Sequence, residues 1–75
     1  MKLEVAVHTD NTGVAENNLA ISQRHSQSLV NYLIKKGISN KRMVAMGFGG
    51  TKPISPNFLE KERKLNRRID FIVIN

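Results

Sequence analysis

The chain has 75 residues, no cysteine, and 12 Lys and Arg against 6 Asp and Glu, for a formal net charge of +6. This length predicts one small domain, residues 1–75, and the lack of thiols excludes disulfides and thiolate metal sites. No stretch has the length of a membrane-spanning segment, and residues 1–20 lack the apolar run of an export signal. The basic residues are dispersed, which is typical of a solvated surface.

The first half of the chain predicts a strand, a polar loop and a long helix. Residues 2–7 alternate between apolar side chains and small or polar ones, as a strand does. The turn-forming residues of positions 8–13 follow, and the apolar positions of residues 15–36 then recur at helical spacing. Ser22 and Ser26 share the apolar face, so we expect this helix to lie close to a sheet. Gly37, after two lysines, predicts the end of the helix.

The second half predicts two more strands and a short helix. Residues 43–48 form an apolar strand, which completes a parallel, right-handed strand–helix–strand unit. Residues 58–65 predict a short charged helix. Residues 68–74 predict a strand that is apolar on both sides, and such a strand usually has cover on both sides or a neighbour beyond it. The fold class is α+β, with a small mixed sheet of about three strands, a βαβ unit, one long helix and one short helix.

The loop after the first strand is the best candidate site, because ligands of α/β sheets gather at the carboxyl ends of strands. Asp10 places one carboxylate there. His8 and Asp10 are too few for a metal site when only one other histidine is present, and no Ser–His–acid set is recognisable. The sequence therefore gives little support for an enzyme and predicts no metal and no cofactor.

Two adjacent arginines precede the last strand. Neighbouring side chains of a strand point to opposite faces, so Arg67 and Arg68 are predicted to diverge. One arginine would reach a site while the other pairs with an acid on the far side of the sheet. The alternative is two solvated arginines at a strand end.

Four segments in order resemble the OmpA-like C-terminal domain, the peptidoglycan-associating module of outer-membrane proteins, lipoproteins and flagellar-motor stators. Residues 5–13 (VAVHTDNTG) resemble the family's V-x-G-H-T-D-x-x-G. Residues 18–38 resemble N-x-x-L-S-x-x-R-A followed by V-x-x-Y-L-x-x-x-G-I. Residues 46–53 resemble G-x-G-x-x-x-P, and residues 63–69 resemble R-x-x-N-R-R-V. The resemblance implies a mixed sheet with helices packed on it, of which this chain would lack the first strand and the first helix.

The resemblance also implies a function, the non-catalytic binding of peptidoglycan through the diaminopimelate side chain of its stem peptide. Such binding anchors an outer-membrane or envelope protein to the cell wall, in the periplasm. The diaminopimelate side chain ends in an ammonium and a carboxylate, so its site needs an acid and a base close together. Asp10 matches the family's aspartate, which accepts the ammonium. Thr12 and Asn18 match polar positions that line the site, and Arg67 matches an arginine at its rim.

The family's helix arginine falls on His25. Arg24, one residue away, lies about 100° around the helix and points elsewhere. A histidine pairs with a carboxylate only when it is protonated, and it lacks the two-pronged geometry of a guanidinium. Two hypotheses therefore stand, a peptidoglycan-binding module and a structural or interaction fragment of the same fold that has lost its ligand. A nucleic-acid binder is favoured less, because no aromatic platform motif accompanies the basic residues.

The last strand also bears on assembly. In the family's sheet the absent first strand would lie beside it, so residues 68–74 would present an open edge. Unpaired strand edges tend to pair with another chain. We therefore expect a homodimer or higher oligomer formed through the exposed sheet edge.

Overall fold

The first strand of the chain is the centre of a three-stranded mixed sheet. The structure is a computed structural model that describes residues 2–74. Strand β1 (Leu3–His8) pairs in parallel with β2 (Met43–Gly49) and antiparallel with β3 (Ile69–Val73), so the strand order is β2-β1-β3. The predicted mixed sheet and its parallel βαβ unit are confirmed.

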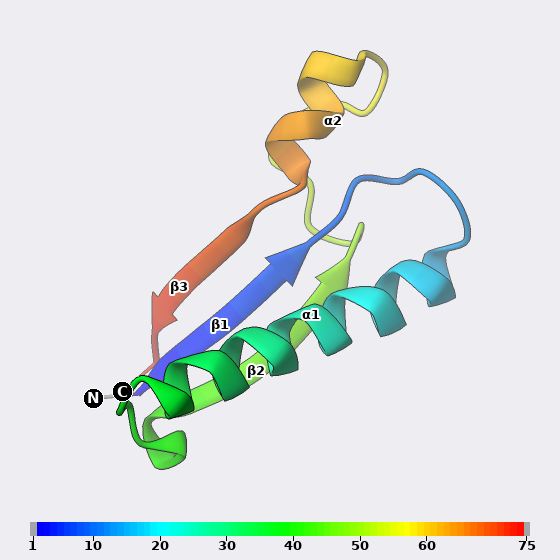
Figure 1. Ribbon diagram of the computed structural model, residues 1–75. Helices are drawn as coiled ribbons and strands as arrows, with labels where there is room; N and C mark the ends of the chain where they lie inside the picture. Colours follow the sequence, from blue (N-terminus) through cyan, green and yellow to red (C-terminus); the bar gives the residue numbers. More distant parts are fainter. Residues whose placement is uncertain (1, 75) are drawn as a thin grey trace.

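Two helices complete the fold within residues 2–74, and the prediction of one long and one short helix is confirmed. Helix α1 (Ala15–Lys35) links β1 to β2 through a 3-10 turn (Asn40–Arg42), and helix α2 (Glu60–Asn66) precedes β3. Figure 1 shows α1 lying along the sheet, while α2 stands beyond the carboxyl ends of β1 and β2. In the described part of the chain, neither helix combines the length and apolar character needed to cross a bilayer.

Helix α1 lies against the sheet because the residues between them are small. Ser22 and Ser26 have no exposed surface, and Val30 is buried on the same face. Gly47 of β2 faces the helix, where an added Cβ would lie 2.1 Å from the backbone nitrogen of Gln23. The close approach predicted from the two serines is confirmed, and it requires glycine at position 47.

The two serines also bond the helix to the sheet. The Ser26 hydroxyl donates to the carbonyl of Val5 and accepts the N–H of Met46 at 3.0 Å. The Ser22 hydroxyl accepts the N–H of Gly49 at 2.9 Å. These bonds join α1 to both β1 and β2. They also give partners to backbone groups of the two strands, which would cost free energy if they were buried without one.

The helix ends differ slightly from the predicted ones. Helix α1 ends at Lys35, and Gly37 follows with a φ of +104°, the left-handed conformation expected just after a helix. Helix α2 spans Glu60–Asn66 and not residues 58–65. The Glu62 carboxylate accepts the N–H of Leu59 at 3.0 Å, which makes Leu59 the residue before the first turn.

Strand β3 lies outside the area that α1 covers, since α1 packs on β2 and β1. Ile69, Phe71 and Val73 pair with β1 residues that face the helix, yet all three are more than half exposed. Ile72 and Ile74, which lie on the other face, are also exposed. Of the two arrangements that the pattern left open, cover on both faces is absent for β3 within residues 2–74, and the strand has a neighbour, β1, on one edge only. The pattern reported apolar side chains correctly but not what packs on them.

The imidazole of His8 is buried at the end of β1, with its side chain 3% exposed. The ring stacks on Phe48, with ring centroids 5.3 Å apart. Its Nε2 lies 3.4 Å from a carboxylate oxygen of Asp70, and its Nδ1 has no hydrogen-bond partner among residues 2–74. The ring is therefore held in a site that suits its neutral form.

Charged neighbours add to this effect. Burial, and then the positive charge of Arg68, lower the pKa of His8 below its ordinary value of 6.5. The negative charge of Asp70 opposes the shift, and Lys52 and Glu4 have smaller effects in opposite directions.

We expect the free energy of unfolding to fall as the pH drops below 6.5, the ordinary pKa of histidine. The unfolded chain takes up the His8 proton at a higher pH than the folded chain, so this stability is complete above that pH and is lost below it. Urea unfolding measured between about pH 7.5 and pH 5 checks the expectation. The His8→Phe variant, which cannot titrate, is the control, and an equal loss in that variant would contradict the assignment to His8.

Candidate functional site

Asp10 lies in the loop between β1 and α1, and both of its carboxylate oxygens are bonded. Oδ1 accepts a hydrogen bond from the N–H of Thr12 at 2.8 Å, and Oδ2 accepts one from Nη1 of Arg67 at 2.9 Å. The residue is only 5% exposed. A buried carboxylate is stable only with such partners, so the position of this charge is fixed by the fold.

The loop itself rests on the end of β2. The N–H of Thr9 donates to the carbonyl of Gly49 at 2.9 Å. Gly50 lies against the backbone of Asp10, where an added Cβ would be 2.8 Å from the Asp10 carbonyl oxygen. Gly50, the residue after β2, therefore allows the loop to sit directly on the sheet's end.

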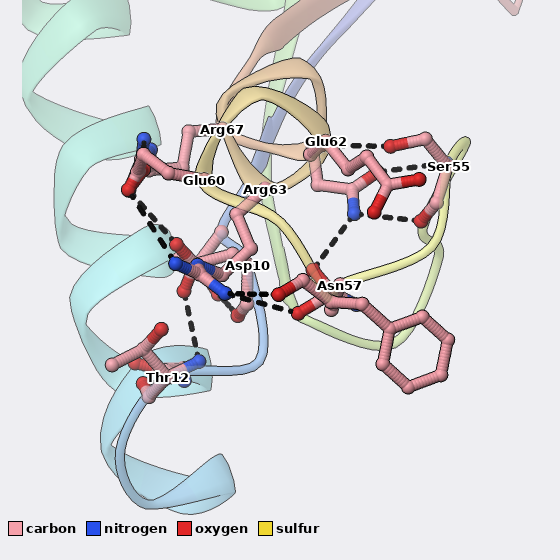
Figure 2. A network of polar contacts seen from close by, with 12 residues as sticks. Asp10, Thr12, Ser55, Asn57, Glu60, Glu62, Arg63 and Arg67 are labelled. Atoms are coloured by element: carbon pink, nitrogen blue, oxygen red, sulfur yellow. Dashed lines mark hydrogen bonds and ion pairs between the residues drawn. The ribbon is translucent and has the colours of Figure 1, made fainter.

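Arg67 joins Asp10 to helix α2. Its Nη1 donates to Asp10, and its Nη2 donates to the carboxylate of Glu60. The other Glu60 oxygen lies 3.8 Å from Nη2 of Arg63 (Figure 2). The side chains of Arg67 and Glu60 are 46% and 61% exposed, against 7% for Asp10. The paired side chains Asp10, Arg67, Glu60 and Arg63 therefore alternate in charge. The series is buried at Asp10 and exposed to solvent at Glu60.

Both members of the Asp10–Arg67 pair stay charged at neutral pH. The N–H and then the hydroxyl of Thr12, followed by Arg67, lower the pKa of Asp10, although burial alone would raise it. Hydrogen bonding to Glu60, with a smaller effect of Asp10, raises the pKa of Arg67. The site thus holds a fixed negative charge beside a fixed positive one.

Arg68 turns away from this site. Its Nε donates to Asp70 at 3.1 Å, and its Nη2 donates to the carbonyl of Lys52 at 3.1 Å. The predicted divergence of Arg67 and Arg68 is confirmed, with Arg68 paired to an acid, while a role of Arg67 in a ligand site stays a prediction.

Thr12 and Asn18 belong to the same network. The side-chain amide of Asn18 donates to the carbonyl of Thr12 at 3.0 Å, which ties the loop to the first turns of α1. A cavity of about 150 Å³ lies beside this contact. Its lining residues are Asn11, Gly13, Ala15, Asn18, Gly50 and Thr51.

His25 lies apart from that network. Its side chain is exposed on α1, and no hydrogen bond or ion pair joins it to another residue within 2–74. Gln23 bonds to the backbone of β2, at 2.8 Å to the N–H of Gly47. His25, two residues further along the helix, therefore lies on the opposite flank of α1, toward β3. Of the five predicted site residues, the structure brings four together and leaves His25 unpaired.

Sequence reasoning missed Glu60 and Asn66. Glu60 and Arg67 are seven residues apart, about two helical turns, so a shared helix face was the available signal. Asn66 has no exposed surface. Its Oδ1 accepts the N–H groups of Ile54 and Ser55, at 2.7 and 3.1 Å, so this side chain fixes the loop between β2 and α2.

The arrangement offers a buried carboxylate beside a half-exposed guanidinium. Within residues 2–74, no group of three His, Asp or Glu side chains could hold a metal ion. The buried carboxylate of Asp10 suits an ammonium, and the half-exposed guanidinium of Arg67 suits a carboxylate.

Comparison with known proteins gives the same picture of the fold. Outer membrane porin F of Pseudomonas fluorescens is 37% identical over 68 residues, which are 91% of this chain and 21% of that protein. The peptidoglycan-binding protein ArfA of Mycobacterium tuberculosis is 30% identical over 66 residues, which are 88% of this chain and 20% of that protein. The chain therefore spans about a fifth of these curated relatives.

The solved structures agree. The crystal structure of the peptidoglycan-associated lipoprotein from Burkholderia pseudomallei has 28% sequence identity and a TM-score of 0.88, and covers 95% of this chain and 60% of that one. A model of the OmpA family matches residues 1–67. The family resemblance of the sequence motifs is confirmed, and the chain belongs to the OmpA family.

Proposed function

We propose that this chain is a non-catalytic peptidoglycan-binding module that anchors an envelope protein to the cell wall, in the periplasm and near the outer membrane. The observation that carries the proposal is the Asp10–Arg67 pair at the sheet's end, with one charge buried and the other half exposed. Support comes from the relatives, which include a peptidoglycan-binding protein, a peptidoglycan-associated lipoprotein and an outer membrane porin.

The ligand group in this proposal is the diaminopimelate side chain. It carries an ammonium and a carboxylate on one carbon, so its two charges are as close together as those of Asp10 and Arg67. Asp10 accepts the ammonium and Arg67 binds the carboxylate. Thr12 and Asn18 line the site. They also hold the loop that carries Asp10. His25 takes the position of the family's helix arginine, where it would bind a carboxylate without the two-pronged geometry of a guanidinium.

A second candidate function is a structural or interaction fragment that keeps the fold without the ligand. Two observations favour it. His25 is unpaired with the site, and Arg67 already contacts two carboxylates of its own chain. Binding to cell-wall sacculi separates the two candidates, because the fragment would not bind.

Replacing Asp10 by alanine should abolish the binding of sacculi, with a loss of affinity of at least about tenfold for a charged hydrogen bond. Co-sedimentation with purified sacculi measures this, and free diaminopimelate should compete with the wild-type chain. Asp70→Ala, which removes the same charge from β3, is the matched control and should bind as the wild type does. Circular dichroism of both variants tests the fold. Wild-type binding by Asp10→Ala would refute the assignment.

The His25→Arg variant should bind sacculi more tightly, by about tenfold, because a guanidinium is charged at every working pH and bonds a carboxylate at two points. Gln27→Arg adds the same charge elsewhere on α1 and should have little effect. If both variants gain affinity equally, the gain is a general effect of positive charge, and the role proposed for His25 is wrong.

We further propose that two copies of this chain associate through the open edge of β3. One edge of β3 is bonded to β1, and no strand within residues 2–74 pairs with the other. Phe71 and its apolar neighbours are exposed along the same strand. Antiparallel pairing of β3 with β3 of a second copy would satisfy the open backbone groups and cover these side chains.

A homodimer or higher oligomer is therefore expected at micromolar concentration, and size-exclusion chromatography with light scattering measures its mass. Phe71→Lys should give a monomer, because it places a charge in the new interface. Leu59→Lys changes another exposed apolar residue, away from β3, and should not alter the mass. A folded wild-type monomer would overturn the proposal.

A further inference from the structure

We infer that Glu60 sets the affinity of the Asp10–Arg67 site, because its carboxylate occupies the part of Arg67 that a ligand's carboxylate would need. The inference rests on the proposed function and adds a residue that limits binding from within the chain. It starts from the way in which one guanidinium is shared between two carboxylates.

A guanidinium binds a carboxylate best through two parallel N–H groups. In this chain those groups are divided, since Nη1 of Arg67 donates to Asp10 and Nη2 donates to Glu60. A ligand carboxylate that approaches from solvent therefore meets a guanidinium already in use. Other N–H groups of the guanidinium remain, but a ligand carboxylate that binds them also meets the negative charges of Asp10 and Glu60, unless it displaces one of these two acids.

Of the two acids, Glu60 is the one that can leave. The Asp10 side chain is 7% exposed and is also fixed by the N–H of Thr12, whereas the Glu60 side chain is 61% exposed. Removing Asp10 from Arg67 would leave a buried charge without its partner, which is costly. Removing Glu60 moves a carboxylate into water, where exposed ion pairs are weak.

Helix α2 offers Glu60 another partner when it leaves. The second Glu60 oxygen already lies 3.8 Å from Nη2 of Arg63. Arg63 is held in place, because its Nη1 donates to the carbonyls of Asn57 and Phe58, both at 3.2 Å (Figure 2). The ligand's carboxylate thus replaces Glu60 on Arg67, and Glu60 turns to Arg63. Since one carboxylate is exchanged for another, the net gain is small, and Glu60 lowers the affinity without blocking the site.

The test compares two stem tetrapeptides that differ in their third residue, diaminopimelate or lysine. The lysine side chain keeps the ammonium and lacks the carboxylate. Glu60→Gln should tighten binding of the diaminopimelate peptide by about two- to fivefold, the range of an exposed ion pair, and should leave the lysine peptide no tighter than before. Glu4→Gln removes the same charge from β1, outside the network, and should change neither. Unchanged or weaker binding of the diaminopimelate peptide, or an equal gain for both peptides, would overturn the inference.

A second measurement keeps this test separate from the proposed function. Acetate is a bare carboxylate, and its contact with Arg67 can be followed through the guanidinium signals in nitrogen-15 NMR spectra. Those signals should respond at lower acetate concentration in Glu60→Gln than in the wild type. If neither tetrapeptide binds, the proposed function fails, and the acetate titration still decides the role of Glu60. An equal response of the two proteins to acetate would show that Glu60 does not compete for Arg67.

Discussion

The ion pair between Asp10 and Arg67 joins residues 57 positions apart, and the candidate site depends on it. Its geometry follows from the sheet. Because β3 runs antiparallel beside β1, the residues before β3 lie next to those after β1. The loop that carries Asp10 and the segment that carries Arg67 are therefore brought together by backbone pairing, before any side chain takes part. Once they meet, the buried carboxylate requires its partner, since breaking the pair would leave an uncompensated charge.

The position of the loop depends in turn on how closely α1 approaches the sheet. The small side chains of Ser22 and Ser26 allow this close approach from the helix side. Gly47 allows it from the sheet side, since a side chain at position 47 would collide with the backbone of the helix. The serine hydroxyls also form hydrogen bonds with the backbones of β1 and β2. The serines therefore hold the helix on the sheet both by their small size and by their hydrogen bonds. A helix held in this way fixes Asn18, whose amide in turn fixes the loop at Thr12. The polar end of the sheet is thus supported from the centre of the domain.

Much of this could be predicted from the sequence, and the remainder has a physical cause. Periodicity located the strands and α1. The position of Asp10 after a strand and of Arg67 before one singled these residues out, and the resemblance gave them roles. Neither could show that Glu60 shares Arg67, because that contact depends on where α2 comes to stand beyond the sheet. The burial of His8 depends on Phe48 and Asp70, which belong to other strands. For a related reason the apolar pattern of β3 left two arrangements open, cover on both faces or a neighbouring strand. An apolar pattern tells which side chains avoid water, but not whether the chain supplies something to cover them.

The central claim is that Asp10 and Arg67 act together on a ligand that carries an ammonium and a carboxylate. An NMR titration of the isotopically labelled chain with the diaminopimelate stem tetrapeptide tests it most directly. The Thr12 amide signal reports on Asp10, because that N–H donates to its carboxylate, and the guanidinium signals report on Arg67. We expect both sets of signals to shift and to saturate at the same peptide concentration. Peptide binding that shifts other residues and leaves both of these unmoved would contradict the account.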